Sequence, residues 1–160
     1  MAGSVPRINK DAHPTAAAPM PASDTREQVA ALCFKETPEG RKVLLVTSRD
    51  TGRWIVPKGW PVKGKDGPGS ALQEAWEEAG AAGKMKPVCI GVYGYRKQMG
   101  DDDDLPCMVN VFPLKVKKLA DDFPERKERR RKWFSLKKAA KKVDEPELAE
   151  IISRFDATSL

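Results

Sequence analysis

After residue 28, apolar residues fall in short runs separated by turn and loop residues. Such runs, bounded by glycine, proline and polar clusters, are typical of strands. They predict strands over residues 29–34, 42–48, 53–57, 85–96, 107–115 and 132–134. Residues 37–40, with the sequence Thr-Pro-Glu-Gly, predict a turn between the first two strands.

Three segments have helical signals. Ser70, with Gln73 three residues later, fits the capping-box pattern and predicts a helix over residues 71–79. Gly80 follows where a left-handed residue commonly ends a helix. Ser135 predicts a helical turn through residue 141, and Pro146 predicts a last helix with apolar residues at helical spacing through residue 155. The order strands, helix, strands, helices predicts an α/β (α+β) fold, a mixed sheet flanked by helices.

The length of 160 residues fits one folded domain. Residues 1–26 are rich in Pro, Ala and Ser without a sustained period, so we expect a disordered leader and a single domain over residues 27–157. The leader has no apolar segment typical of a secretion signal, and no apolar run approaches a membrane span. Three widely spaced cysteines predict reduced thiols in a cytoplasmic protein with no membrane partner.

The distribution of histidine and of charge narrows the chemistry further. His13 is the only histidine and lies in the expected leader, which argues against Ser-His-Asp, Cys-His and histidine-zinc sites. The net charge is +6, and residues 125–142 hold ten Lys or Arg against two Glu. Such a basic zone attracts anions, either a phosphorylated small molecule or a nucleic acid.

The helix over 71–79 holds an unfavourable group of acids. Glu74, Glu77 and Glu78 are spaced i, i+3 and i+4, so they project from one side of the helix and repel one another. They also lie toward its C-terminal end, where the helix dipole disfavours negative charge. A solvated acidic face is the ordinary explanation for Glu-x-x-Glu-Glu. A Mg²⁺ site is the functional one, because this ion prefers oxygen ligands and offsets the repulsion.

The residues around these acids favour the metal site. Gly59, Glu74, Glu77, Glu78 and Gly80 resemble the Nudix box, G-x5-E-x7-R-E-U-x-E-E-x-G-U, where U is aliphatic. The chain around residues 124–135 also resembles the diphosphoinositol and diadenosine polyphosphate phosphohydrolase group of this hydrolase family, and the resemblance covers roughly residues 28–155. It implies an α/β/α sandwich around a mixed sheet.

Two positions depart from the box. Its first Glu falls on Lys65 and its Arg on Gln73. The resemblance implies that the family's Glu and Arg support the metal-binding acids. Their replacement here by Lys65 and Gln73 puts full activity in question. Asp66 could replace the lost carboxylate in part if the loop shifts by one residue.

The resemblance also implies roles for single residues. The Gly59 carbonyl and the side chains of Glu74, Glu77 and Glu78 would hold Mg²⁺, with Mn²⁺ as a substitute, and the three acids would be catalytic. Four basic residues are candidates to bind the substrate's phosphates: Arg49, Arg53, Lys58 and Arg96. Glu125 or Glu128 could add a ligand from the late loop, although pairing with neighbouring Arg explains both.

The implied reaction is attack of water on phosphorus in a diphosphate linkage of a small, highly anionic substrate, a dinucleoside polyphosphate or an inositol pyrophosphate. Two alternatives stay open within the family: a MutT-like nucleoside triphosphate pyrophosphatase, and an impaired module that binds a phosphorylated ligand without cleaving it. Outside it, nucleic-acid binding is the alternative, but the basic run has no stacking aromatics beyond Trp133 and Phe134. The sequence does not give the oligomeric state.

Overall fold

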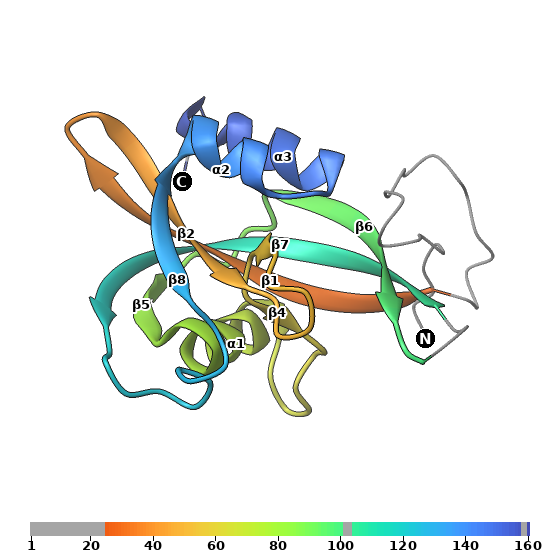
Figure 1. Ribbon diagram of the computed structural model, residues 1–160. Helices are drawn as coiled ribbons and strands as arrows, with labels where there is room; N and C mark the ends of the chain where they lie inside the picture. Colours follow the sequence, from red (N-terminus) through yellow and green to blue (C-terminus); the bar gives the residue numbers. More distant parts are fainter. Residues whose placement is uncertain (1–24, 101–103, 158–159) are drawn as a thin grey trace.

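The computed structural model describes residues 25–100, 104–157 and 160. Its strands form one sheet, with the order β3-β2-β1-β7-β5 along its main path and with β4, β6 and β8 pairing to β1, β7 and β2 (Figure 1). The strands are β1 (Arg26–Thr37), β2 (Gly40–Thr47), β3 (Trp54–Ile55), β4 (Lys58–Gly59), β5 (Ala81–Met85), β6 (Gly91–Gln98), β7 (Asp104–Leu119) and β8 (Arg131–Ser135).

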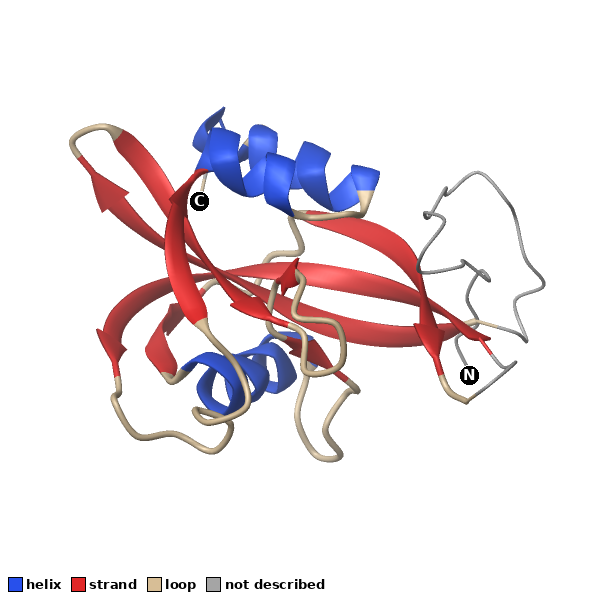
Figure 2. Cartoon of the chain, in the orientation of Figure 1, coloured by secondary structure: helices blue, strands red, loops and turns tan. Residues whose placement is uncertain are grey.

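The central strands make the sheet mixed, as predicted. β1 runs parallel to β7, from Arg26↔Cys107 to Phe34↔Lys115, and antiparallel to β2 and β4. Helix α1 (Gly67–Ala79) covers one face of the sheet, whereas α2 (Leu136–Lys142) and α3 (Pro146–Ser153) cover the other (Figure 2). The α/β/α sandwich is therefore confirmed.

The start of α1 differs from the prediction. The N-cap is Asp66, whose side chain accepts a hydrogen bond from Gly69 N, and Pro68 preorganises the first turn. Ser70 lies inside the helix, where its Oγ accepts a hydrogen bond from Val62 N at 2.8 Å. Asp and Ser both cap helices well, but here the Ser70 hydroxyl contacts the preceding loop and Asp66 serves as the cap. Gly80 ends the helix in the left-handed conformation with φ 66°, as predicted.

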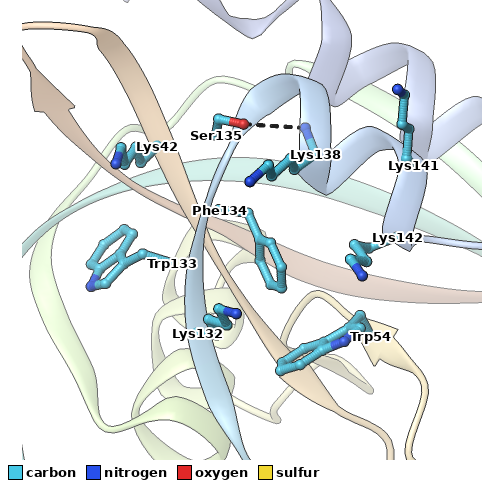
Figure 3. Close-up of a pocket in the computed structure, with 9 residues that line it drawn as sticks. All are labelled: Lys42, Trp54, Lys132, Trp133, Phe134, Ser135, Lys138, Lys141 and Lys142. Carbon is cyan, nitrogen blue, oxygen red and sulfur yellow. Dashed lines mark hydrogen bonds between the residues drawn. The ribbon is translucent and has the colours of Figure 1, made fainter.

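Two further segments need correction. The strand predicted over 85–96 is two strands, because β5 and β6 pair with different stretches of β7 and the chain turns between them at residues 86–90. Pro87 lies in this turn. Phe155 belongs to a short 3-10 helix, Phe155–Ala157, rather than to α3. The cap of α2 is as predicted, since Ser135 Oγ accepts a hydrogen bond from Lys138 N at 3.2 Å (Figure 3).

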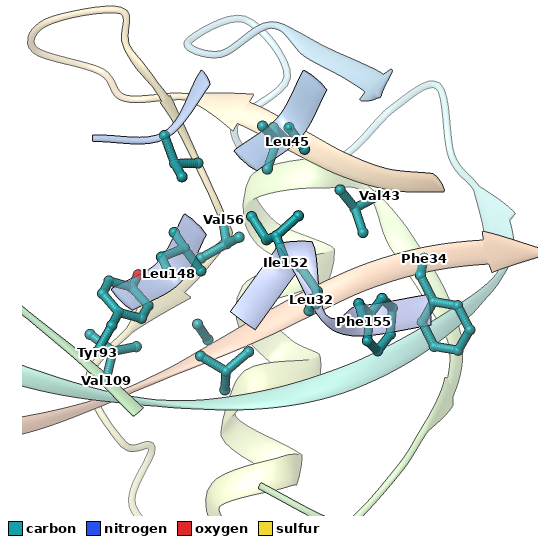
Figure 4. Packing of buried hydrophobic residues seen from close by; sticks show 14 of the residues in the cluster. Leu32, Phe34, Val43, Leu45, Val56, Tyr93, Val109, Leu148, Ile152 and Phe155 are labelled. Atoms are coloured by element: carbon teal, nitrogen blue, oxygen red, sulfur yellow. The ribbon is translucent and has the colours of Figure 1, made fainter. Parts of the chain in front are cut away.

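The core lies on both sides of β1. Ala30, Leu32 and Phe34 face α2 and α3, while Ala31 and Cys33 face α1. This continuous apolar run is typical of a strand covered on both faces. Phe34 packs edge-on against Phe155, with ring centroids 5.0 Å apart (Figure 4).

Some expectations lie largely outside the described residues. The leader falls there except for Thr25 and Arg26, and His13 lies there as well. No helix in the described part of the chain is long and apolar enough to cross a membrane.

Thiol accessibility gives a direct test of this core. Cys33 and Cys107 are buried and Cys89 is exposed. Burial raises the pKa of Cys33 to about 12 and that of Cys107 to about 11, which disfavours the reactive thiolate. We expect a disulfide reagent such as DTNB to titrate one thiol per native chain and all three after denaturation. Rapid reaction of all three in the native protein would contradict the packing of β1 and β7.

Candidate active site

Helix α1 brings two acids to the seam between helix and sheet. Its inward face consists of Ala71, Ala75 and Ala79, which are fully buried against the sheet. Alanine is small, so the helix backbone lies close to β1. Glu74 and Glu78, one helical turn apart, lie at the border of this face and the cavity beside it.

Strand β4 closes in on the same acids. Gly59 pairs with Val29 of β1 and contacts the Glu74 carboxyl group. A Cβ at position 59 would lie 2.6 Å from Glu74 Oε2, which is closer than real Cβ atoms approach oxygen. A side chain at position 59 would therefore displace the Glu74 carboxylate, whereas glycine lets the carboxylate lie against the strand.

The two carboxyl groups are coupled and largely withdrawn from water. Glu78 is only 6% exposed and Glu74 is half-buried. Burial, with repulsion from Glu78 and Glu77, raises the pKa of Glu74. Burial also raises the pKa of Glu78, against the opposing effect of Arg129 and Lys58. Such a pair is costly without a proton or a cation between its members.

Arg129 compensates this charge from the late loop. Its side chain is 7% exposed, and Nε donates to Glu125 Oε1 at 2.7 Å while Nη2 lies 3.5 Å from Glu78 Oε2. Nη1 donates to the Thr47 carbonyl at 3.0 Å. The guanidinium therefore ties the loop to β2 and to α1. Nothing in the sequence separated Arg129 from its basic neighbours, and the expectations above missed it.

Lys58 lies on the opposite side of Glu78. Its backbone N–H donates to Glu78 Oε1 at 3.3 Å, and its amine lies 4.9 Å from the centre of the Tyr95 ring. Burial lowers the pKa of Lys58 to about 8, although Glu78 favours the charged form. Tyr95 is fixed in turn by a hydrogen bond from its hydroxyl to Gln28 Oε1 at 2.6 Å.

A cavity of about 240 Å³ joins these groups. Glu74, Glu78 and Glu125 contribute its acidic side chains, and four cations line it as well: Arg49, Lys58, Lys97 and Arg129. The same four cations line an adjoining cavity of about 130 Å³, which Arg53 also borders. The arrangement offers carboxylates for a metal ion beside a set of cations for phosphate groups.

The structure brings together only some of the residues expected from the sequence. Glu77 does not line either cavity, because Gln73 Nε2 donates to Glu77 Oε2 at 2.9 Å. Glu128 pairs with Arg49 at 3.2 Å outside the acidic cavity, so of the two late-loop acids only Glu125 faces Glu78. Both are paired with arginine: Glu125 with its neighbour Arg129, as expected, and Glu128 with the distant Arg49 rather than a neighbour.

The basic side chains also divide. Arg53 binds Glu145 at 3.0 Å and Asp144 at 3.6 Å, at the edge of the smaller cavity. Arg96 binds Asp104 at 3.0 Å and lines neither cavity. Its neighbour Lys97 lines both, since successive residues of a strand face opposite sides.

Carboxylates are the kind of ligand that a hard divalent cation prefers, but few of them converge at this site. Among the described residues, no three acidic, histidine or cysteine side chains converge at metal-binding distance. Glu74 and Glu78 do face one another beside Gly59. Mg²⁺ is commonly held by one or two carboxylates, with waters and substrate phosphates completing its shell, so this pair fits it.

Comparison with known proteins gives consistent matches. The family model described as NUDIX domain matches residues 26–155. The chain is 32% identical over 118 residues to mouse (Mus musculus) diphosphoinositol polyphosphate phosphohydrolase 3-alpha, covering 72% of this chain and 68% of that protein. It is 29% identical over 134 residues to diphosphoinositol polyphosphate phosphohydrolase 2 of Rattus norvegicus, covering 81% and 70%.

Solved structures share the fold at lower identity. The C. elegans Ap4A hydrolase matches with a TM-score of 0.59 at 19% identity, over 83% of this chain and 97% of that one. The E. coli dihydroneopterin triphosphate pyrophosphohydrolase matches with a TM-score of 0.64 at 15% identity, over 83% and 96%.

The buried acids around Arg129 predict that its side chain contributes strongly to the free energy of unfolding. We expect Arg129→Gln to lower the free energy of unfolding by about 3–5 kcal/mol in EDTA, because it leaves Glu78 and Glu125 without their buried cation. The matched control is Arg126→Gln, whose ion pair with Asp122 is solvent-exposed and should change stability by less than about 1 kcal/mol. Equal effects in urea denaturation would show that Arg129 does not compensate the acids.

Proposed function

The chain belongs to the Nudix family and is a Nudix hydrolase, and we propose that it uses Mg²⁺ to hydrolyse a diphosphate linkage in a highly anionic small molecule. The observation that carries the proposal is the pair of adjacent acids, buried Glu78 and half-buried Glu74, which line a cavity together with four cations. A carboxylate pair of this kind serves a metal ion, and the cations serve phosphate groups.

The metal site is proposed from residues of α1 and β4. Glu78, Glu74 and the carbonyl of Gly59 would hold Mg²⁺, or Mn²⁺ in its place. Bound there, the ion would offset negative charge on the phosphates and activate water. Glu77 would join only if its hydrogen bond with Gln73 breaks, and Glu125 would join only if it leaves Arg129.

Phosphate binding is proposed for cations of the two adjoining cavities. Arg49 and Lys58 line both, and Arg53 borders the smaller one. To these expected residues the structure adds Lys97 and Arg129. Arg96 is less suited, because Asp104 holds it outside the cavities. The cavities together extend from the acids along the cations, which suits a substrate with phosphates beyond the cleaved linkage.

The chemical step is simple. Water adds to one phosphorus, the bridging P–O bond breaks, and the second phosphate leaves with the electron pair. Glu74 is our candidate for accepting the water's proton, because its carboxylate lines the cavity beside the proposed metal position. Lys58 and Arg129 offset the charge that develops on the phosphates.

The relatives guide the choice of substrate class. The similar proteins of mouse and rat are named for diphosphoinositol polyphosphates, and a protein of the same fold is named for Ap4A. We therefore propose inositol pyrophosphates and dinucleoside polyphosphates as the first two classes, ahead of nucleoside triphosphates. The density of cations in the cavities is consistent with either class.

Replacing Glu78 by Gln is the main test. We expect Glu78→Gln to lower kcat by more than about 100-fold, because loss of a metal ligand removes several kcal/mol of transition-state stabilisation. The amide retains an acceptor for Lys58 N, so the fold should survive. Glu150→Gln, an exposed acid on α3 paired with Arg154, is the matched control and should keep full activity.

The assay uses an inositol pyrophosphate, a diadenosine polyphosphate and a nucleoside triphosphate, each with Mg²⁺ or with EDTA, and separates products by chromatography. Cleavage of one class in Mg²⁺ alone would support the proposal and identify the class. Near-normal turnover by Glu78→Gln would overturn the metal site. Binding without cleavage by the folded wild type would favour the alternative of an impaired module, which the Gln73–Glu77 hydrogen bond specifically supports.

We also propose that residues 27–157 form one catalytic domain that does not need the leader. The first strand begins at Arg26, and the described helices, strands and site residues all lie within residues 26–157. Deleting residues 1–24 should leave the unfolding temperature and kcat unchanged. A large fall in kcat for the shortened chain, with its fold intact, would assign the leader a role in the site.

A further inference from the structure

A third cavity, with a different composition, lies apart from the two described above. It has a volume of about 660 Å³ and is formed by β2, β3, β8 and α2. Five lysines line it: Lys42, Lys132, Lys138, Lys141 and Lys142. Figure 3 shows Lys132, Lys138 and Lys142 around Phe134, with Trp54 at one end. Lys138 and Lys142 are one helical turn apart and share a face of α2.

The lysine charges are not compensated within the described part of the protein. None of the five forms an ion pair with a described acid. The acids that follow α2, Asp144 and Glu145, are both bound by Arg53. Several like charges around one concave surface repel one another, so an anion bound there would be stabilised by all of them.

The aromatic residues of the cavity are already engaged. Trp54 packs edge-on against Phe134 with centroids 5.1 Å apart, and the Arg130 guanidinium lies 5.5 Å from the Trp54 ring. The Trp133 ring has Lys35 Nζ at 4.4 Å. Binding of nucleic-acid strands typically uses free aromatic faces on which bases stack. This cavity instead offers charge, which favours a compact anion over a base-bearing strand.

The cavity is separate from the candidate active site. The two cavities beside Glu74 and Glu78 share no lining residue with it. Arg53 and Trp54 are adjacent in the chain, yet Arg53 borders the active-site side and Trp54 lines the lysine cavity. Neither cavity therefore needs the other for its own ligand.

We propose that this lysine cavity is a second anion site, which binds a compact polyphosphorylated anion without a metal ion and without cleaving it. Lysine is a point charge with three donors, so it accepts phosphates in varied orientations. Both a linear phosphate chain and phosphates around a sugar-like ring have the required chemistry. The site does not depend on the proposed hydrolase function.

Calorimetric titration of the full chain in EDTA tests the site, because chelation removes any metal-assisted binding at Glu74 and Glu78. Tripolyphosphate and inositol hexakisphosphate are the two probes, and their affinities distinguish a chain from a ring. We expect Lys138→Gln/Lys142→Gln to weaken binding by about ten-fold or more. The matched control is Lys117→Gln/Lys118→Gln, two exposed lysines of β7 that line none of the three cavities.

The outcomes separate the proposal from its alternatives. Loss of affinity in the α2 variant, with the β7 variant unchanged, would support it. Equal losses of affinity in both variants would indicate unspecific attraction to net charge. A loss of affinity in Arg49→Gln, with the α2 variant unchanged, would show that the anion binds at the active site instead. Each of these two results would overturn the proposal. It would also be overturned if neither probe bound, or if a single-stranded oligouridylate bound more tightly than both probes. All five substituted side chains are exposed, so the variants should fold, as thermal unfolding would verify.

Discussion

The approach of α1 to β1 is the constraint on which the candidate site depends. Three alanines let the helix backbone lie against the sheet, and Gly59 lets β4 reach the helix from the side. Larger residues at the alanine positions would push the helix outward and return Glu74 and Glu78 to solvent, and a side chain at position 59 would displace the Glu74 carboxylate. Close packing of small residues thus produces an electrostatic effect, because it withdraws two carboxylates from water and raises their pKa values.

The fold tolerates this charge because cations approach it from three other segments. Lys58 comes from β4, Arg49 from the loop after β2, and Arg129 from the loop before β8. Arg129 matters most for architecture, since it is buried and binds a strand carbonyl as well as two acids. Stability and function are therefore linked here, as the same guanidinium that neutralises Glu78 also borders the proposed phosphate site.

Sequence patterns predicted the mixed sheet, the approximate strands and the left-handed Gly80, because these depend on local spacing and turn chemistry. They did not predict which acids meet. Glu77 and Glu78 differ by about 100° around the helix, so spacing alone leaves open which one faces the cavity. The choice of Lys97 over Arg96 depends on strand register, and the choice of Asp66 over Ser70 as cap depends on a contact with Val62. These are tertiary facts.

The basic run over residues 125–142 shows why a charge count is a weak guide. The Lys and Arg residues of this run are close together in the sequence, but in the structure their side chains point to different parts of the molecule. Arg129 turns inward to the acids, while Arg131 donates to the Ala79 carbonyl at the end of α1 and stacks on Phe123. Lys132 and three lysines of α2 (Lys138, Lys141 and Lys142) instead line a cavity elsewhere. Strand alternation and helical spacing thus divide one basic segment among a buried ion pair, a helix terminus and an open anion-binding surface.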